Sequence, residues 1–179
     1  MYDTLFKNGR IVDGTGNPWF KADVAVIEGK VAAIGRQVAG EAERVIDASG
    51  LVVTPGFIDL HTHSDRSIRT NNKATSSIMA GVTTEAVGNC GGSAYSGRGQ
   101  ADIKMDLKRY SERLNETGIG INIAPFIGHN TIRTSVMGSE GNGGERMTPS
   151  GNELEEMKRL VEEAMAQGAF GLTTGIWYP

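Results

Sequence analysis

Hydrophobic and polar positions follow two different patterns on either side of Pro55 and Gly56. Before this point, short segments of alternating apolar and polar residues are separated by turn signals, a pattern typical of half-buried antiparallel strands. The expected hairpins are Thr4–Lys7 with Arg10–Val12 around Asn8-Gly9, Ala22–Ile27 with Val31–Ile34 around Glu28-Gly29-Lys30, and Arg44–Asp47 with Leu51–Thr54 around Ala48-Ser49-Gly50. Residues 1–54 are therefore predicted to form a small antiparallel unit, part of a β-sandwich.

From Gly56 onward, strand-like and helix-like segments alternate, which predicts βα units and a parallel sheet. The helix beginning after Ser150 has the clearest signals, because Ser150 and Glu153 form a capping box and Gly168 provides a stop. The polar segment Ser135–Pro149 is expected to be a loop. The expected strands are Phe57–Leu60, Val82–Val87, Ile121–Ile127 and Phe170–Thr174, and the earlier helices are Lys73–Ala80 and Ile103–Glu116.

This succession of units corresponds to about half of an eight-stranded (β/α)8 barrel, a fold that typically needs about 250 residues. Half of a barrel leaves an open parallel edge and an uncovered apolar interior. We therefore expect an α/β fold in which residues 55–179 form the first half of a TIM-like barrel, truncated after Pro179. The alternative is a complete, open α/β sheet.

Composition and charge exclude several classes of protein. The 179 residues carry a net charge of -3 and no basic stripe, which argues against a nucleic-acid partner. Every apolar run is far shorter than the roughly 18 residues of a membrane helix, and the N-terminus lacks the pattern of a secretion signal. Cys90 is the single cysteine and has no intrachain disulfide partner, in agreement with a reducing compartment. We expect a soluble cytoplasmic protein.

Two histidines and the cysteine suggest a metal site. His61 and His63 directly follow the first strand of the predicted barrel, where alternation places both imidazoles on one side, about 6–7 Å apart. Cys90 follows the second strand among glycines, and a thiolate beside two imidazoles suits Zn²⁺. Active sites of βα barrels lie at this end of the strands. The alternatives are a chance histidine pair held by hydrogen bonds and a buried, inert thiol.

Several motifs in collinear order cover the whole chain. They are Asn8–Gly16, Pro55–Asp65, Gly81–Thr84, Gly88–Gly91, Ile127–Arg133 and Gly168–Pro179. With these motifs the sequence resembles the D-aminoacylase branch of the amidohydrolase superfamily. Most amidohydrolases use a carboxylated lysine or a glutamate as the bridging metal ligand, whereas this branch uses a cysteine.

The resemblance assigns roles to individual residues. It implies that Cys90 is a zinc ligand and that His61 and His63 serve a weaker or second metal position, so that one or two Zn²⁺ ions bind. Tyr178 matches a tyrosine implicated in holding the substrate. His129 and Arg133 match a motif without an assigned role, and a structural role for His129 is an equal alternative.

The resemblance further implies hydrolysis of a small-molecule N-acyl-D-amino acid to a carboxylate and a free D-amino acid. The catalytic general base of the family lies on a later strand, beyond residue 179, and neither Asp59 nor Asp65 matches it. We therefore expect this chain to be inactive alone and to require a complementing C-terminal half, in the same or a second chain. The alternatives are a cyclic-amide hydrolase resembling hydantoinase or dihydroorotase, which would place a lysine on a later strand, and a non-catalytic metal-binding α/β chain.

Overall fold

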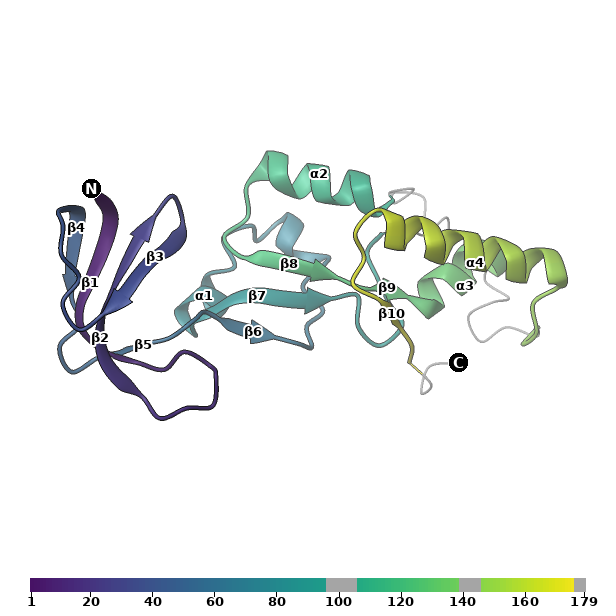
Figure 1. Ribbon diagram of the computed structural model, residues 1–179. Coiled ribbons are helices and arrows are strands. Elements are labelled where there is room, and N and C mark those ends of the chain that lie inside the picture. The colour runs from purple at the N-terminus through teal and green to yellow at the C-terminus, as the bar shows by residue number, and fades with distance from the viewer. Residues whose placement is uncertain (96–105, 139–145, 176–179) are drawn as a thin grey trace. The chain divides into compact units, whose positions relative to one another are not determined.

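The computed structural model describes residues 1–95, 106–138 and 146–175, and the chain divides into two compact units, Met1–Pro55 and Gly56–Pro179 (Figure 1). The first unit is a five-stranded sheet of order β3-β2-β1-β4, in which β5 also pairs with β1. Its strands are β1 (Tyr2–Ile11), β2 (Phe20–Ile27), β3 (Lys30–Gly35), β4 (Ala42–Asp47) and β5 (Val52–Val53). Ile11, Ala22 and Val24 form the centre of its small core.

The hairpin predicted at Asn8-Gly9 is wrong, because β1 runs through both residues as one strand. Asn8 has a left-handed φ of 65°, and the register with β2 shifts between Phe6 and Gly9, so the pair forms a bulge. The amide of Asn8 donates a hydrogen bond to Asp23 Oδ1 of β2 at 2.8 Å. The positive φ angle that a hairpin turn requires is equally suited to a bulge, and pairing of β1 along its whole length decides between them.

The hairpin predicted around Ala48-Ser49-Gly50 is also wrong, because β4 and β5 both run parallel to β1 instead of pairing with each other. Asp47 Oδ1 accepts hydrogen bonds from the amide and the hydroxyl of Ser49, at 3.1 and 2.7 Å. After this turn β5 continues in the same direction as β4, and both strands run parallel to β1. The β2–β3 hairpin is confirmed, with φ of 49° at Glu28 and 71° at Gly29.

The second unit contains only parallel strand pairs among its described residues, as predicted. Its two sheets have the orders β6-β7-β8 and β10-β9. The predicted third strand is split at Phe126, whose amide donates to Val87 O at 2.8 Å, while the amide of Phe170 donates to Pro125 O at 2.8 Å. The strands are β6 (Phe57–Asp59), β7 (Val82–Val87), β8 (Asn122–Pro125), β9 (Ile127–Gly128) and β10 (Leu172–Thr173).

The helices of this unit agree with the predictions in part. The first, α1, is shorter than expected because Ala74 adopts a left-handed conformation, with φ 44° and ψ 42°. The helix α3 was not predicted, and it includes the first residues of the expected loop Ser135–Pro149, of which residues 139–145 lie outside the described ranges. The helices are η1 (Ser67–Arg69), α1 (Thr75–Met79), α2 (Leu107–Thr117), α3 (His129–Met137) and α4 (Gly151–Ala166).

The core of the second unit lies between the helices and the strands. Leu107, Tyr110 and Leu114 of α2 are buried in one cluster with Ile127 of β9 and Met157 of α4. Of the expected helix Ile103–Glu116, residues 103–105 lie outside the described ranges, and α2 begins at Leu107, where the side chain of Asp106 accepts from the amide of Arg109 as an N-cap. None of the helices in the described ranges is both long and apolar enough to cross a membrane.

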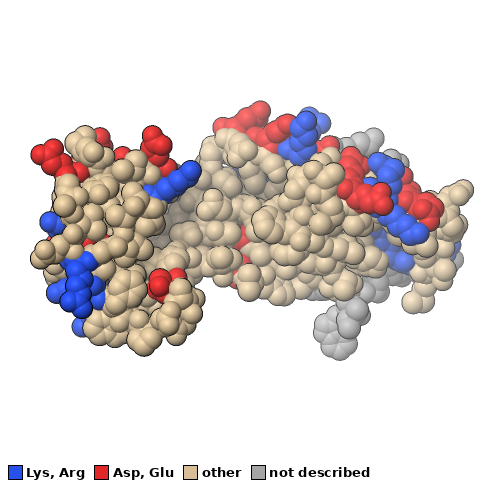
Figure 2. Space-filling view, viewed as in Figure 1, with Lys and Arg blue, Asp and Glu red and all other residues tan. Residues whose placement is uncertain are grey.

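The exposed side of α4 carries charges of both signs (Figure 2). Arg159 forms ion pairs with Glu156 at 2.8 Å and Glu163 at 2.9 Å, one helical turn away on either side. Such surface pairs stabilise a helix only slightly. The charged pattern of this helix is therefore a solvated face.

The capping box before α4 predicts a pH-dependent contact. Hydrogen bonds from Arg146 and from Ser150 lower the pKa of Glu153 from 4.5 to about 2. Because the pKa of Glu153 is lower in the folded state, its ionised form stabilises the fold. This stabilisation is complete above pH 4.5 and is lost as the pH falls through about 2. An NMR titration of the Glu153 carboxyl carbon should give this low midpoint, and Arg146→Gln should raise it. A midpoint at 4.5 in the unchanged chain would contradict the contact.

Candidate metal centre

His61, His63 and Cys90 come together at the carboxyl ends of two neighbouring parallel strands. Their nearest ligand atoms, two imidazole nitrogens and one sulfur, all lie within 4.8 Å of one another. His61 Nε2 is 3.1 Å from Cys90 Sγ, and the two imidazole rings are 5.5 Å apart at an angle of 64°. Because β6 and β7 pair in parallel, the segments that follow them leave the sheet at the same edge.

The two histidines reach this place by a different route from the one expected. The strand β6 ends at Asp59, so His61 and His63 belong to the segment after the strand and not to alternating strand positions. Asp59 Oδ1 accepts a hydrogen bond from the amide of His61 at 3.1 Å, which forms a local turn. The turn, rather than strand alternation, directs the first imidazole toward Cys90.

Thr62 joins the histidine segment to the segment that carries Cys90. Its amide and its hydroxyl both donate to the carbonyl oxygen of Ala86 in β7, at 3.1 and 3.0 Å. The side chain of Asn89 donates to Thr62 O at 3.2 Å and to Ala86 O at 2.9 Å. The residue between the two histidines and the residue before Cys90 therefore share one hydrogen-bond network.

Cys90 has a left-handed φ of 55°, a conformation that costs a non-glycine residue about 1–2 kcal/mol. Its neighbours hold it in this state. The hydroxyl of Thr173 in β10 donates to Gly88 O and accepts from the amide of Gly91, and Gly91 O accepts from the amides of Asn130 and Thr131 at 2.8 and 3.1 Å. The first turn of α3 and the strand β10 thus both hold the loop of residues 88–91 that carries Cys90, which we call the cysteine loop.

Two buried carboxylates, Asp65 and Glu85, hydrogen-bond to the segments around the cluster. Asp65 Oδ2 accepts from the amide of Ala94 at 2.7 Å, and burial raises the pKa of this carboxyl group. Glu85 of β7 accepts hydrogen bonds from the hydroxyls of Ser64 and Ser77. Sequence reasoning tested Asp65 only as a catalytic base and missed Glu85. An acidic residue inside a strand-like segment was the available signal for Glu85.

The remaining residues singled out from the sequence lie elsewhere. His129 is the first residue of α3 and is not a member of the cluster. Arg133 donates from Nη2 to Met147 O at 2.5 Å and so joins α3 to the segment before α4. Tyr178 lies outside the described residues.

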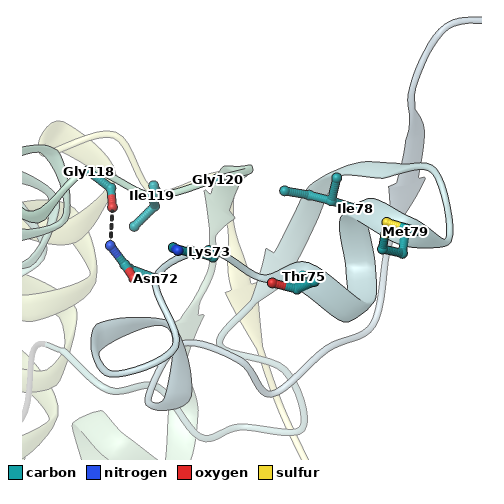
Figure 3. A pocket seen from close by; sticks show the side chains of 8 residues that line it. All are labelled: Asn72, Lys73, Thr75, Ile78, Met79, Gly118, Ile119 and Gly120. Carbon is teal, nitrogen blue, oxygen red and sulfur yellow. Dashed lines mark hydrogen bonds between the residues drawn. The ribbon is translucent and has the colours of Figure 1, made fainter.

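A concavity of about 430 Å³ lies at the other ends of the strands, away from the cluster (Figure 3). Asn72 and Lys73 before α1 and Gly118 to Gly120 before β8 form much of its wall. Asn72 closes it with hydrogen bonds to Gly118 O at 2.9 Å and from the amide of Gly120 at 2.8 Å. In βα barrels this end serves stability, whereas active sites lie at the carboxyl end.

The donor set of the cluster suits a borderline-soft ion such as Zn²⁺, which binds imidazole nitrogen and thiolate sulfur. Both histidines are exposed and Cys90 is half-buried, so the cluster is accessible from solvent. The residues present therefore fit a zinc ion.

Comparison with known proteins identifies the class. Residues 44–175 match the model of the amidohydrolase family, and the chain belongs to this family. It is 36% identical to the D-aminoacylase of Alcaligenes xylosoxydans xylosoxydans, over 99% of this chain and 38% of that protein, and 34% identical to the N-acyl-D-aspartate deacylase of the same organism, over 99% and 37%. The resemblance to the D-aminoacylase branch is confirmed.

A solved structure agrees with this result. The N-acyl-D-glutamate deacylase of Bordetella bronchiseptica, in complex with zinc and a phosphonate inhibitor that mimics the tetrahedral intermediate, superimposes with a TM-score of 0.90 at 33% identity. The match covers 99% of this chain and 39% of that one. The chain thus spans about two fifths of the length of the relatives it matches.

Proposed function

We propose that this chain is the N-terminal part of a zinc-dependent deacylase that hydrolyses the linear amide bond of N-acyl-D-amino acids. The observation that carries the proposal is the meeting of His61, His63 and Cys90 at one edge of a parallel sheet. Similarity to D-aminoacylase along 99% of the chain supports the same substrate class.

The proposal includes the architecture. Residues 55–179 supply the first four strand positions of a (β/α)8 barrel, and residues 1–54 supply part of a β-sandwich. Support comes from the four successive parallel strand positions and from β6, where Phe57 and Ile58 remain 57% and 61% exposed. Apolar side chains exposed on both faces of one strand are expected where further barrel strands pack against it.

In this proposal Cys90, His61 and His63 hold one or two zinc ions, and Tyr178 contacts the substrate. Zinc supplies Lewis-acid chemistry for amide hydrolysis when it is bound. The side chains of Thr62 and Asn89 orient the ligands, and the exposed histidines leave the substrate a path to the site. The general base and further histidine ligands lie beyond residue 179, in a complementing C-terminal half of the same or a second chain.

The test begins with a denaturing intact-mass spectrum of the protein as it occurs in its cells, followed by zinc content and a deacylation assay on the same preparation. We expect a longer parent chain or a second polypeptide, bound zinc, and release of amine from N-acetyl-D-amino acids but not from their L-enantiomers. A lone 19.1 kDa monomer would contradict the half-barrel. A zinc-loaded preparation that hydrolyses cyclic amides in place of N-acyl-D-amino acids would contradict the substrate class.

A further inference from the structure

We propose that Asp65 is a positioning residue that sets the spacing between the histidine pair and Cys90; this inference rests on the proposed function. Asp65 lies two residues after His63, and its hydrogen-bond partner Ala94 lies four residues after Cys90. The hydrogen bond of 2.7 Å from Ala94 N to Asp65 Oδ2 therefore adds a further link between the two segments that carry the three side chains of the cluster.

Both ends of this contact are held in place. The phenol of Tyr110 in α2 donates to the carbonyl oxygen of Asp65 at 2.7 Å, and the phenol of Tyr95 donates to Phe126 O at 2.7 Å. The two tyrosine rings lie 4.8 Å apart, and each is at most 1% exposed. Because the backbone of Asp65 and the segment after the cysteine loop are anchored by buried aromatic residues, the carboxylate forms a link of defined length.

Together with a contact of Asn89, this hydrogen bond links both sides of Cys90 to the histidine segment. Asn89 ties the loop to Thr62 on the N-terminal side of the cysteine, and Asp65 ties it through Ala94 on the C-terminal side. The histidine segment contributes both partners. Removal of either tie would loosen one side of the segment around Cys90 relative to the histidine segment.

A purely structural role explains Asp65 poorly. Asp65 is 4% exposed and forms no ion pair among the described residues, and burying such a carboxylate opposes folding. Contacts behind metal ligands orient those ligands, and their removal typically lowers metal affinity 10- to 100-fold. A buried carboxylate that connects the two segments carrying the candidate ligands is suited to orienting those ligands.

The test uses the full chain and Co²⁺ in place of zinc, because a cysteine thiolate bound to Co²⁺ gives a near-ultraviolet charge-transfer band. In Asp65→Ala we expect a loss of Co²⁺ affinity of about 10- to 100-fold and a weaker band. In Asp65→Asn, which keeps an oxygen acceptor for the amide of Ala94, we expect most of the affinity and the band to return. If Asp65→Ala does not fold, Asp65→Ser takes its place in the comparison with Asp65→Asn, because the serine hydroxyl is too short to reach the amide of Ala94.

Asp106→Ala is the matched control. Asp106 also accepts a hydrogen bond from a backbone amide, that of Arg109 at 2.8 Å, but at the start of α2 and outside the cluster. We expect this variant to lose stability without losing Co²⁺ affinity. If the Asp65 and Asp106 variants weaken Co²⁺ binding equally, or if Asp65→Ala binds like the unchanged chain, the inference is overturned. Absence of the thiolate band in the unchanged chain would instead overturn the proposed function, and this inference with it.

Discussion

Cys90→Ala is expected to lower zinc affinity by at least roughly a hundredfold. Structural zinc sites with four ligands bind with about 10–16 kcal/mol, or about 3 kcal/mol for each ligand, and 1.4 kcal/mol corresponds to a factor of ten. Cys90 supplies the sulfur of the cluster and lies 3.1 Å from His61 Nε2, so its loss would remove the thiolate ligand of the proposed site. Titration with zinc in competition with a chromophoric chelator measures the change.

The chain offers its own control for this experiment. His129 is the third histidine of the sequence and lies outside the cluster, so His129→Ala should bind zinc like the unchanged chain, whereas His61→Ala should not. Full zinc binding by the Cys90 variant would remove the cysteine from the site. Equal losses in the His129 and His61 variants would point to general unfolding instead of ligand removal.

Gly88→Ala is expected to destabilise the second unit by about 4 kcal/mol or more, a loss that is exceptional for a single substitution. A Cβ atom at this position would lie 1.9 Å from the carbonyl oxygen of Phe126, which belongs to the backbone and cannot rotate away. The left-handed φ of 81° adds about 1–2 kcal/mol for any residue with a Cβ atom. Chemical denaturation followed by circular dichroism measures the change in unfolding free energy.

Gly118→Ala separates these two contributions. Gly118 has a similar φ of 70°, but a Cβ atom there would meet nothing within 4 Å, so we expect a loss of only about 1–2 kcal/mol. The difference between the two variants reports the clash with Phe126. Equal losses would mean that the cysteine loop and the bend at Phe126 do not pack as closely as the structure shows.

Local signals predicted those elements that depend on neighbouring residues. The strand β7 has the expected bounds, Val82–Val87, and the Ser150–Glu153 capping box forms at the start of α4. Caps and short apolar runs act over a few residues, so they need no information from distant parts of the chain. The same local reasoning misplaced Asn8-Gly9, because one positive φ angle suits both a hairpin turn and a bulge.

The sequence by itself indicated which residues form the candidate site, and the resemblance to the D-aminoacylase branch favoured a metal site over a chance histidine pair and an inert thiol. His61, His63 and Cys90 were identifiable as ligand candidates because each follows an expected strand of a βα unit, and parallel pairing brings such positions to one edge. Their chemistry is a property of the residue types, so it does not depend on the details of packing.

Only the tertiary structure decided how these three candidate ligands are held. His61 and Cys90 are 29 residues apart in the chain, and the 3.1 Å between them results from the pairing of β6 with β7 together with the ties of Thr62 and Asn89. The contact between Asp65 and Ala94 likewise spans 29 residues and is buried under Tyr95 and Tyr110. Hydrogen bonds over such separations depend on how the whole unit packs, because side-chain patterns specify the face of an element but not its partner.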